Sequence, residues 1–142
     1  MSVHKVNHNV IRPWNGTEGA LTVSGGATPT KTSEWFDCNG WTDKRVSWEI
    51  DSGGTIDANI TMHISPIGAY ELNALVAAGT DTTDQYEAVT IVDAHTAAIM
   101  ASIDAEDVDE LQRPFRSVRF VIDNDQAAEA ITGFTVWFEG WS

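Results

Sequence analysis

The chain has 142 residues, of which 42% are hydrophobic and 20% are charged, enough for one domain with a sizeable buried core. Its 8 Lys and Arg residues against 21 Asp and Glu residues give a formal net charge of −13. This charge repels phosphate backbones and anionic membrane surfaces, so neither nucleic-acid binding nor membrane binding is expected. The N-terminal residues lack the apolar core of a signal peptide, no run approaches membrane-spanning length, and Cys38 is the one cysteine. We therefore expect the chain to fold in a reducing cytosol.

Residues 1–32 are polar and rich in turn-forming residues, and we predict that they form an extended N-terminal arm ahead of a β-sandwich domain at residues 33–142. Two short candidate strands lie in the arm, at residues 3–10 and 20–24. We expect the arm to add to the edge of a sheet, in this chain or in a neighbouring subunit, with a mobile tail as the alternative. Trp14 favours docking, because an indole has a large apolar surface to bury.

The first predicted strand of the domain covers residues 33–38 and is followed by a turn at Asn39-Gly40. Cys38 lies two residues after Phe36, so a strand places both side chains on one face. We interpret Cys38 as a buried structural thiol rather than a nucleophile, since no histidine lies near it in the sequence.

Residues 44–65 form the clearest strand pattern in the chain. Apolar residues alternate with polar ones on both sides of Ser52-Gly53-Gly54, namely Val46, Trp48 and Ile50 before the glycines and Ile56, Ala58, Ile60, Met62 and Ile64 after them. This pattern predicts a β-hairpin with one buried face. A three-residue loop would pair Asp51 with Thr55 and set Ile50 opposite Ile56, Trp48 opposite Ala58 and Val46 opposite Ile60.

The outward face of this predicted hairpin carries charged side chains. In the same register, Glu49 opposes Asp57 and Asp43 opposes His63. Two carboxylates directly opposite one another are unfavourable in water. We interpret them as solvent-exposed acids and not as a catalytic pair, because acids on an outward strand face are usually part of the surface.

The segment after the hairpin is mixed. Residues 69–78 have apolar residues at helical spacing, which predicts a short helix or a covering loop, and residues 86–92 return to a strand pattern. Residues 94–103 suit either a helix, from their alanines and methionine, or a strand, from their length, and both alternatives stay open.

The last two predicted strands are strongly apolar. Residues 115–123 bury Val118, Phe120 and Ile122, and residues 131–141 place Phe134, Val136 and Phe138 on one face and Ile131, Trp137 and Trp141 on the other. A strand that is apolar on both faces is covered on both faces. The sandwich core covers one face, and the arm, the helix-like segment or another subunit covers the second.

We therefore expect a partner-binding surface on this second face of the last strand. The candidate contact residues are Trp14, Ile131, Trp137 and Trp141, together with Arg113 and Arg116, which serve as local counter-ions or as contacts for an acidic neighbour.

No metal site and no catalytic site are predicted. His4 and His8 have the spacing of a helical metal pair, but their neighbours do not favour a helix. The acidic residues 104–110 lack the ligands of an EF-hand loop, because Val108 and Asp109 stand where an oxygen ligand and a glycine are required. A solvated acidic turn is favoured, with a calcium site of another type as the alternative. No nucleophile–base constellation can be identified either, so an enzyme with a cofactor is not expected.

The strand and turn signals together predict an all-β fold, an antiparallel β-sandwich that is jelly-roll-like or Ig-like, with one or two short helical segments. Over about residues 33–141 the succession of strands resembles small virion β-sandwiches of tailed bacteriophages, which include capsid decoration (cement) proteins and related tail or fibre modules. The resemblance is carried by the runs Trp35-Phe36-Asp37, Val46-Ser47-Trp48-Glu49-Ile50, Ile60-Thr61-Met62-His63-Ile64-Ser65-Pro66 and Pro114-Phe115-Arg116-Ser117-Val118-Arg119-Phe120-Val121-Ile122.

The resemblance implies a non-enzymatic structural protein that is made in the host cytoplasm and located on the capsid surface of a virion. Its implied partners are further copies of itself, with a homotrimer favoured, and the lattice of a major capsid protein, to which several copies would bind at once. The alternative is a carbohydrate- or receptor-binding β-sandwich module, because the six tryptophans could form a stacking platform for sugars.

Overall fold

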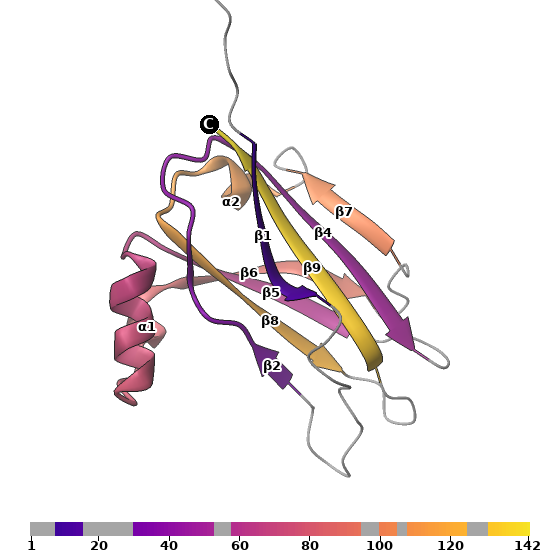
Figure 1. Cartoon of the computed structure of the whole chain (residues 1–142), viewed down its shortest axis with the longest axis horizontal. Helices are drawn as coiled ribbons and strands as arrows, with labels where there is room; N and C mark the ends of the chain where they lie inside the picture. Colours follow the sequence, from indigo (N-terminus) through magenta and orange to yellow (C-terminus); the bar gives the residue numbers. More distant parts are fainter. Residues whose placement is uncertain (1–7, 16–29, 53–57, 95–99, 105–107, 125–130) are drawn as a thin grey trace, which may run out of the picture.

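The computed structural model describes residues 8–15, 30–52, 58–94, 100–104, 108–124 and 131–142 (Figure 1). One antiparallel sheet contains, in spatial order, β1 (His8–Asn15), β9 (Ile131–Trp141), β4 (Asp43–Ser52) and β7 (Met100–Asp104). The second contains β2 (Thr30–Thr32), β8 (Ser117–Asn124), β5 (Ala58–Ser65) and β6 (Glu87–Ala94), with β3 (Phe36–Asp37) also paired to β8. The helical segments are α1 (Ala69–Ala77), the 3₁₀ turn η1 (Thr83–Gln85) and α2 (Asp109–Gln112).

The order of the strands is that of a jelly roll. The chain crosses from one sheet to the other after β1, β3, β4, β6, β7 and β8, so that most neighbours within a sheet are distant in the sequence. The two sheets enclose one main hydrophobic core. The predicted all-β sandwich is confirmed, and the strand order selects the jelly-roll-like alternative.

The predicted hairpin over residues 44–65 is wrong, although both of its strands exist. β4 pairs with β9 and β7, whereas β5 lies in the opposite sheet and pairs with β8 and β6. Trp48 is therefore paired with Val136 and Ala101, not with Ala58. Period-two alternation reveals which face of a strand is buried, but two facing sheets bury their inward faces alike. The pattern could not distinguish a neighbour in the same sheet from a strand across the core.

The charge pairs predicted from that register are wrong for the same reason. Glu49 lies opposite Thr135, and Asp43 lies opposite Trp141. Asp57, the predicted neighbour of Glu49, lies outside the described residues.

The predicted inward faces of these strands are nevertheless confirmed. The fully or almost fully buried side chains include Val46, Trp48 and Ile50 of β4, Ala58, Ile60, Met62 and Ile64 of β5, Val118, Phe120 and Ile122 of β8, and Phe134, Val136 and Phe138 of β9. Burial of this apolar surface is the main source of stability in a β-sandwich.

The prediction that Ile131 lies on the outward face of β9 is wrong. Ile131 is 1% exposed and belongs to the core. The pairing of β9 with β4 shifts register between Asp51 and Ser52, where Gly133 and Ile131 are the partners. A β-bulge adds one residue to one strand, so the residue beyond it changes face.

Part of the predicted N-terminal arm is a strand of this chain's own sandwich. β1 pairs along β9 at the edge of the first sheet, and its register shifts between Ile11 and Trp14, where Pro13 lies. Proline has no N–H to donate, and an edge strand with a bulge accommodates it. Trp14 is 4% exposed and packs edge-on against Phe134, with ring centroids 5.2 Å apart. The candidate strand at residues 20–24 lies outside the described residues.

The remaining predicted segments differ from the structure mainly at their ends. The predicted helix at residues 69–78 is confirmed as α1. The ambiguous residues 94–103 contain the start of β7, with residues 95–99 outside the described part. Of the predicted first strand, residues 36–37 alone are β-strand, and Cys38 is 1% exposed in the core, as predicted. The acidic residues 104–110 include the end of β7 and the start of α2.

A second, smaller cluster joins α1 to the outer face of the second sheet. Leu72 of α1 packs with Trp35, and the side-chain amide of Asn73 accepts a hydrogen bond from the Trp35 backbone N–H at 2.8 Å and donates one to the Trp35 carbonyl at 3.0 Å. On the same side, the Arg119 guanidinium carbon lies 4.9 Å from the Trp35 ring centroid. This arrangement gives the outer face of the second sheet its own apolar cover.

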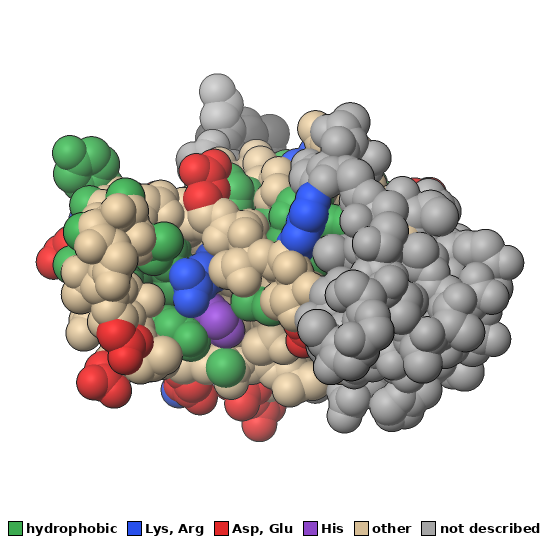
Figure 2. Space-filling model, turned by 90° about the horizontal axis from the view of Figure 1, so that it is seen from below, with side chains coloured by type: hydrophobic (Ala, Val, Ile, Leu, Met, Phe, Trp, Pro, Cys, Tyr) green, Lys and Arg blue, Asp and Glu red, His purple; other side chains and the backbone are tan. Residues whose placement is uncertain are grey.

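His63 is a titratable side chain that lies beside this cluster. Arg119 lies opposite it in the sheet, and the Arg119 Nε donates a hydrogen bond to His63 Nδ1 at 2.9 Å. The imidazole stacks on the ring of Tyr86 with centroids 4.0 Å apart. In the view of Figure 2, a histidine lies beside a basic side chain among hydrophobic side chains. Burial, and secondarily the Arg119 charge, lower the pKa of His63 from 6.5 to about 4.

We predict that substituting Gly140, on the inward face of β9, lowers the stability of the fold. A Cβ at Gly140 would overlap the indole of Trp41, whereas a Cβ at Gly68 would meet the mobile end of Arg116 at 3.3 Å. Gly140→Ala should lower the free energy of unfolding by about 1–3 kcal/mol, and the control Gly68→Ala by less than about 1 kcal/mol. Urea unfolding followed by tryptophan fluorescence measures both. Equal midpoints for the two variants would contradict the close packing of Trp41 on β9.

We also predict that His63 makes the fold sensitive to mild acid. The unfolded chain binds the proton near pH 6.5, whereas the folded chain binds it near pH 4. The contribution of His63 to the free energy of unfolding is therefore complete above pH 6.5 and is lost as the pH falls towards 4. Its total is roughly 3 kcal/mol. Urea unfolding across this range measures it. His63→Asn keeps a hydrogen-bond acceptor for Arg119 but cannot titrate, so the stability of this variant should fall less with decreasing pH than that of the wild type. Parallel plots of stability against pH for the two proteins would assign the acid sensitivity to other groups.

Candidate interaction surface and pocket

The outer face of the first sheet carries a row of half-buried side chains. Alternation along β9 points Trp137, Glu139 and Trp141 away from the core. Arg45 of β4 lies opposite Glu139, and His8 of β1 lies opposite Trp141. The His8 Nε2 lies 2.9 Å from a carboxylate oxygen of Glu139, so this acid links the edge strand to β9. We call this row the outer face of β9.

Charged and aromatic groups of the same sheet lie over both indoles. The guanidinium carbon of Arg12 is 5.9 Å from the ring centroid of Trp137, and that of Arg45 is 5.9 Å from the centroid of Trp141. The His8 ring stacks on Trp141, with centroids 4.9 Å apart and 14° between the planes. Cations over an indole face are favourable, and the indoles are held in fixed positions while remaining partly exposed. The surface is therefore amphipathic, with aromatic and charged groups side by side.

The structure divides the predicted partner-binding residues among different places. Trp137 and Trp141 lie on the outer face of β9, as expected. Trp14 and Ile131 are buried in this chain's own core, where they contribute to folding rather than to an exposed surface. A role in partner binding stays a prediction for Trp137 and Trp141.

The two predicted arginines lie at the end of the sandwich where α2 and the C-terminus meet (Figure 1). Arg113 and Arg116 flank Pro114-Phe115, the connection between α2 and β8. The Arg113 Nη2 donates to a Glu87 carboxylate oxygen at 2.9 Å, and both side chains are about half exposed. Such an exposed pair adds little stability, but it orients Arg113 towards β6.

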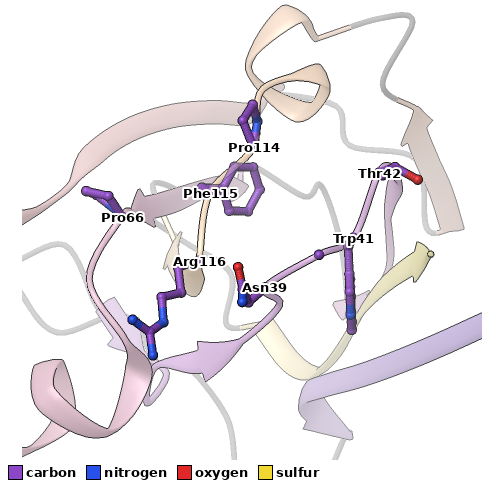
Figure 3. A pocket seen from close by; sticks show the side chains of 8 residues that line it. Asn39, Trp41, Thr42, Pro66, Pro114, Phe115 and Arg116 are labelled. Carbon is purple, nitrogen blue, oxygen red and sulfur yellow. The ribbon is translucent and has the colours of Figure 1, made fainter.

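Arg116 instead borders a cavity of about 340 Å³ (Figure 3). The cavity is lined by Asn39, Gly40, Trp41, Thr42, Pro66, Pro114, Phe115 and Arg116. Trp41 also packs on Phe138, with ring centroids 5.2 Å apart. A smaller cavity of about 160 Å³ shares the Pro66, Pro114 and Phe115 walls and extends to Arg113 and Glu87.

A buried lysine supports the floor of this region. Lys44 is 1% exposed, and its Nζ donates to the carbonyls of Leu111 at 3.0 Å and Arg113 at 3.2 Å while lying 4.7 Å from the Phe115 ring centroid. Burial lowers the Lys44 pKa. Burial likewise raises the pKa of the Cys38 thiol to about 12, so the thiol stays protonated. These groups hold the structure together, and neither is placed for nucleophilic chemistry.

Sequence reasoning identified Arg116 but not the rest of the pocket. Asn39 was assigned to a turn, and no role in a site was predicted for Trp41 or Pro66. The lining comes from three segments that are far apart in the sequence, and their meeting depends on strand pairing across the fold. The one available signal was the concentration of Pro, Gly and aromatic residues in these three connections.

No metal site is found among the residues that the structure describes: no group of three or more His, Cys, Asp or Glu side chains could hold an ion. His8 of the predicted His4–His8 pair stacks on Trp141, and His4 lies outside the described part. None of the described helices is long and apolar enough to cross a membrane.

Comparisons with known proteins identify a fold and no family. No protein-family profile matches the sequence, and no curated protein matches it. Among solved structures, the chain is similar to that of infectious bursal disease virus strain Gx, with a TM-score of 0.50, 13% identity, and 97% of this chain and 33% of the other covered. The VP2 protein of the same virus in T=1 particles gives a TM-score of 0.50 and 11% identity over 95% of this chain and 32% of the other. Strain Gt gives a TM-score of 0.50 and 8% identity over 97% of this chain and 38% of the other.

This chain spans about a third of the length of the viral proteins it resembles. At identities this low, the likeness concerns the fold. The chain is a jelly-roll-like β-sandwich of the type found in a viral capsid protein.

Proposed function

We propose that this chain is a structural, non-enzymatic component of a virus particle: a capsid decoration protein that binds the outer face of a bacteriophage head as a homo-oligomer, with a trimer favoured. The observation that supports the proposal most is the jelly-roll order of the strands, together with the similarity of the fold to a viral protein in T=1 particles. Jelly rolls recur in viral capsid domains, where rigid sandwiches pack side by side.

The outer face of β9 is the surface that we assign to contacts between copies. Trp137 and Trp141 are half-buried in one chain, and a second surface over them would remove the remaining apolar area from water. Arg12, Arg45 and Glu139 surround the indoles and can form charged contacts at the rim. The residues that contribute most to binding energy lie near the centre of an interface and are enriched in aromatic residues and arginine.

The charge of −13 constrains how such copies meet. Two strongly acidic molecules repel each other at long range, so association has to come from short-range apolar and paired contacts. Salt screens the repulsion, with a Debye length of about 8 Å at physiological ionic strength. Self-association should therefore strengthen, rather than weaken, as salt is added.

Sugar binding on the same face is the second candidate. Two partly exposed indoles four residues apart on one strand lie about 13 Å from each other, a spacing that could serve two sugar rings. However, Arg12 and Arg45 already lie over Trp137 and Trp141, which leaves less free ring surface for stacking. A glycan array separates the two proposals, because a capsid contact needs no sugar.

We predict that the protein is an oligomer whose assembly depends on the outer face of β9. Light scattering coupled to size exclusion, at micromolar concentration and physiological salt, should give about three times the mass of one chain. Trp137→Ser combined with Trp141→Ser should reduce the mass to that of one chain, because the contact loses both apolar centres. Tyr70→Ser is the control, since Tyr70 is 91% exposed on α1, away from this face.

A monomer of wild-type protein under these conditions would contradict the oligomer, and an unchanged mass of the double variant would contradict the assigned face. Point variants are preferable to removal of residues 1–32, because that truncation would delete β1 and the core residue Trp14. Circular dichroism of each variant checks that the sandwich is intact.

A further inference from the structure

Three arginines follow one another along the connection into β8 and along β8 itself, and two of them are already engaged. Arg113 donates to Glu87 at 2.9 Å, and Arg119 donates to His63 at 2.9 Å. Within the part of the chain that the structure describes, the Arg116 guanidinium has no hydrogen bond and no ion pair. This guanidinium belongs to a residue that borders the larger of the two cavities described above.

The backbone of Arg116 is fixed on both sides. Its N–H donates to the carbonyl of Ser65 at 2.9 Å, and its carbonyl accepts from the N–H of Cys38 at 2.9 Å. The side chain starts from this fixed position at the wall of the cavity, and its guanidinium turns away from Asn39 to lie against Gly68 at the start of α1 (Figure 3).

The rest of the lining combines flat apolar side chains with the polar Asn39 and Thr42. Phe115 is 8% exposed and rests on the Lys44 ammonium, and Trp41 is held between the cavity and Gly140. Pro66 and Pro114 also line the cavity. Grooves lined by aromatic side chains are a recurring means of binding extended peptides.

We propose that this cavity binds a short acidic peptide segment of a partner protein, in which a carboxylate stands next to an apolar side chain. Arg116 would bind the carboxylate through two parallel N–H donors, and the apolar side chain would lie between Trp41 and Phe115. A volume of about 340 Å³ is at the small end of ligand sites and suits one or two side chains. The pocket lies at the end of the sandwich, where Thr42 of its lining donates to the Trp141 carbonyl, and the proposal does not depend on a role in a virion.

A titration of the full chain with short peptides tests the pocket directly. The probes are acetylated and amidated tetrapeptides Gly-X-Glu-Gly, in which X is Pro, Phe, Trp or Leu, each beside its Gly-X-Gln-Gly counterpart. Backbone amide signals of the ¹⁵N-labelled protein should shift at the lining residues, including Gly40 and Arg116, with at least one glutamate peptide. Its glutamine counterpart should bind about tenfold or more weakly, because a charge-assisted pair is lost.

Three variants assign the effect to the guanidinium. Arg116→Gln should abolish the preference for glutamate, and Arg116→Lys should retain only part of it, because an ammonium cannot form the two parallel bonds. Arg113→Gln is the matched control three residues away and should leave peptide binding unchanged. The same spectra report whether each variant is folded.

Several results would overturn the proposal. The pocket signals could fail to shift with every glutamate peptide at millimolar concentration, or the glutamine peptides could bind equally well. Equal shifts with sodium acetate alone would reduce the site to anion binding. A loss of self-association in Arg116→Gln would identify a second copy of this chain as the occupant. All but the last of these results would leave the mass measurement on the outer face of β9 unaffected.

Discussion

The structure depends on the burial of the inward faces of four central strands. β9 and β4 form the middle of the first sheet, and β8 and β5 form the middle of the second. Their facing side chains, such as Phe138 and Val46 on one side and Phe120 and Ile60 on the other, are completely buried. The edge strands, the helix α1 and the pocket are all attached to this core. Hydrophobic burial therefore fixes the framework on which both candidate surfaces are placed.

The alternation of apolar and polar residues was sufficient to predict the fold class and most of the core. It identified the inward residues of β4, β5, β8 and β9, because burial follows directly from a period of two. It could not predict which strands are neighbours, since Trp48 is equally buried whether Ala58 lies beside it or across the core. It also misplaced Ile131, because a bulge changes the face of a residue without altering the local pattern.

The two candidate sites were predictable to different degrees. Trp137 and Trp141 were assigned to the outer face of β9 because both lie in one strand of fixed periodicity. The pocket beside Arg116 was not predictable, because it forms where three connections converge and no single segment carries its pattern. The contact between His63 and Arg119 was missed for a related reason: it requires the register of β5 against β8, which local sequence does not contain.

The position of the two strands nearest the C-terminus has a consequence for how the protein is made. β8 and β9 occupy central places in the two sheets, and β9 separates β1 from β4, so that His8 lies opposite Trp141. A nascent chain that has not yet reached Ser117 has strands whose hydrogen-bonding partners are still missing from both layers. We expect the sandwich to close late, after synthesis of residue 141, and at the slow rate typical of folds with distant pairings. During that interval, the strong negative charge of the polypeptide discourages unfinished molecules from sticking to one another on the ribosome.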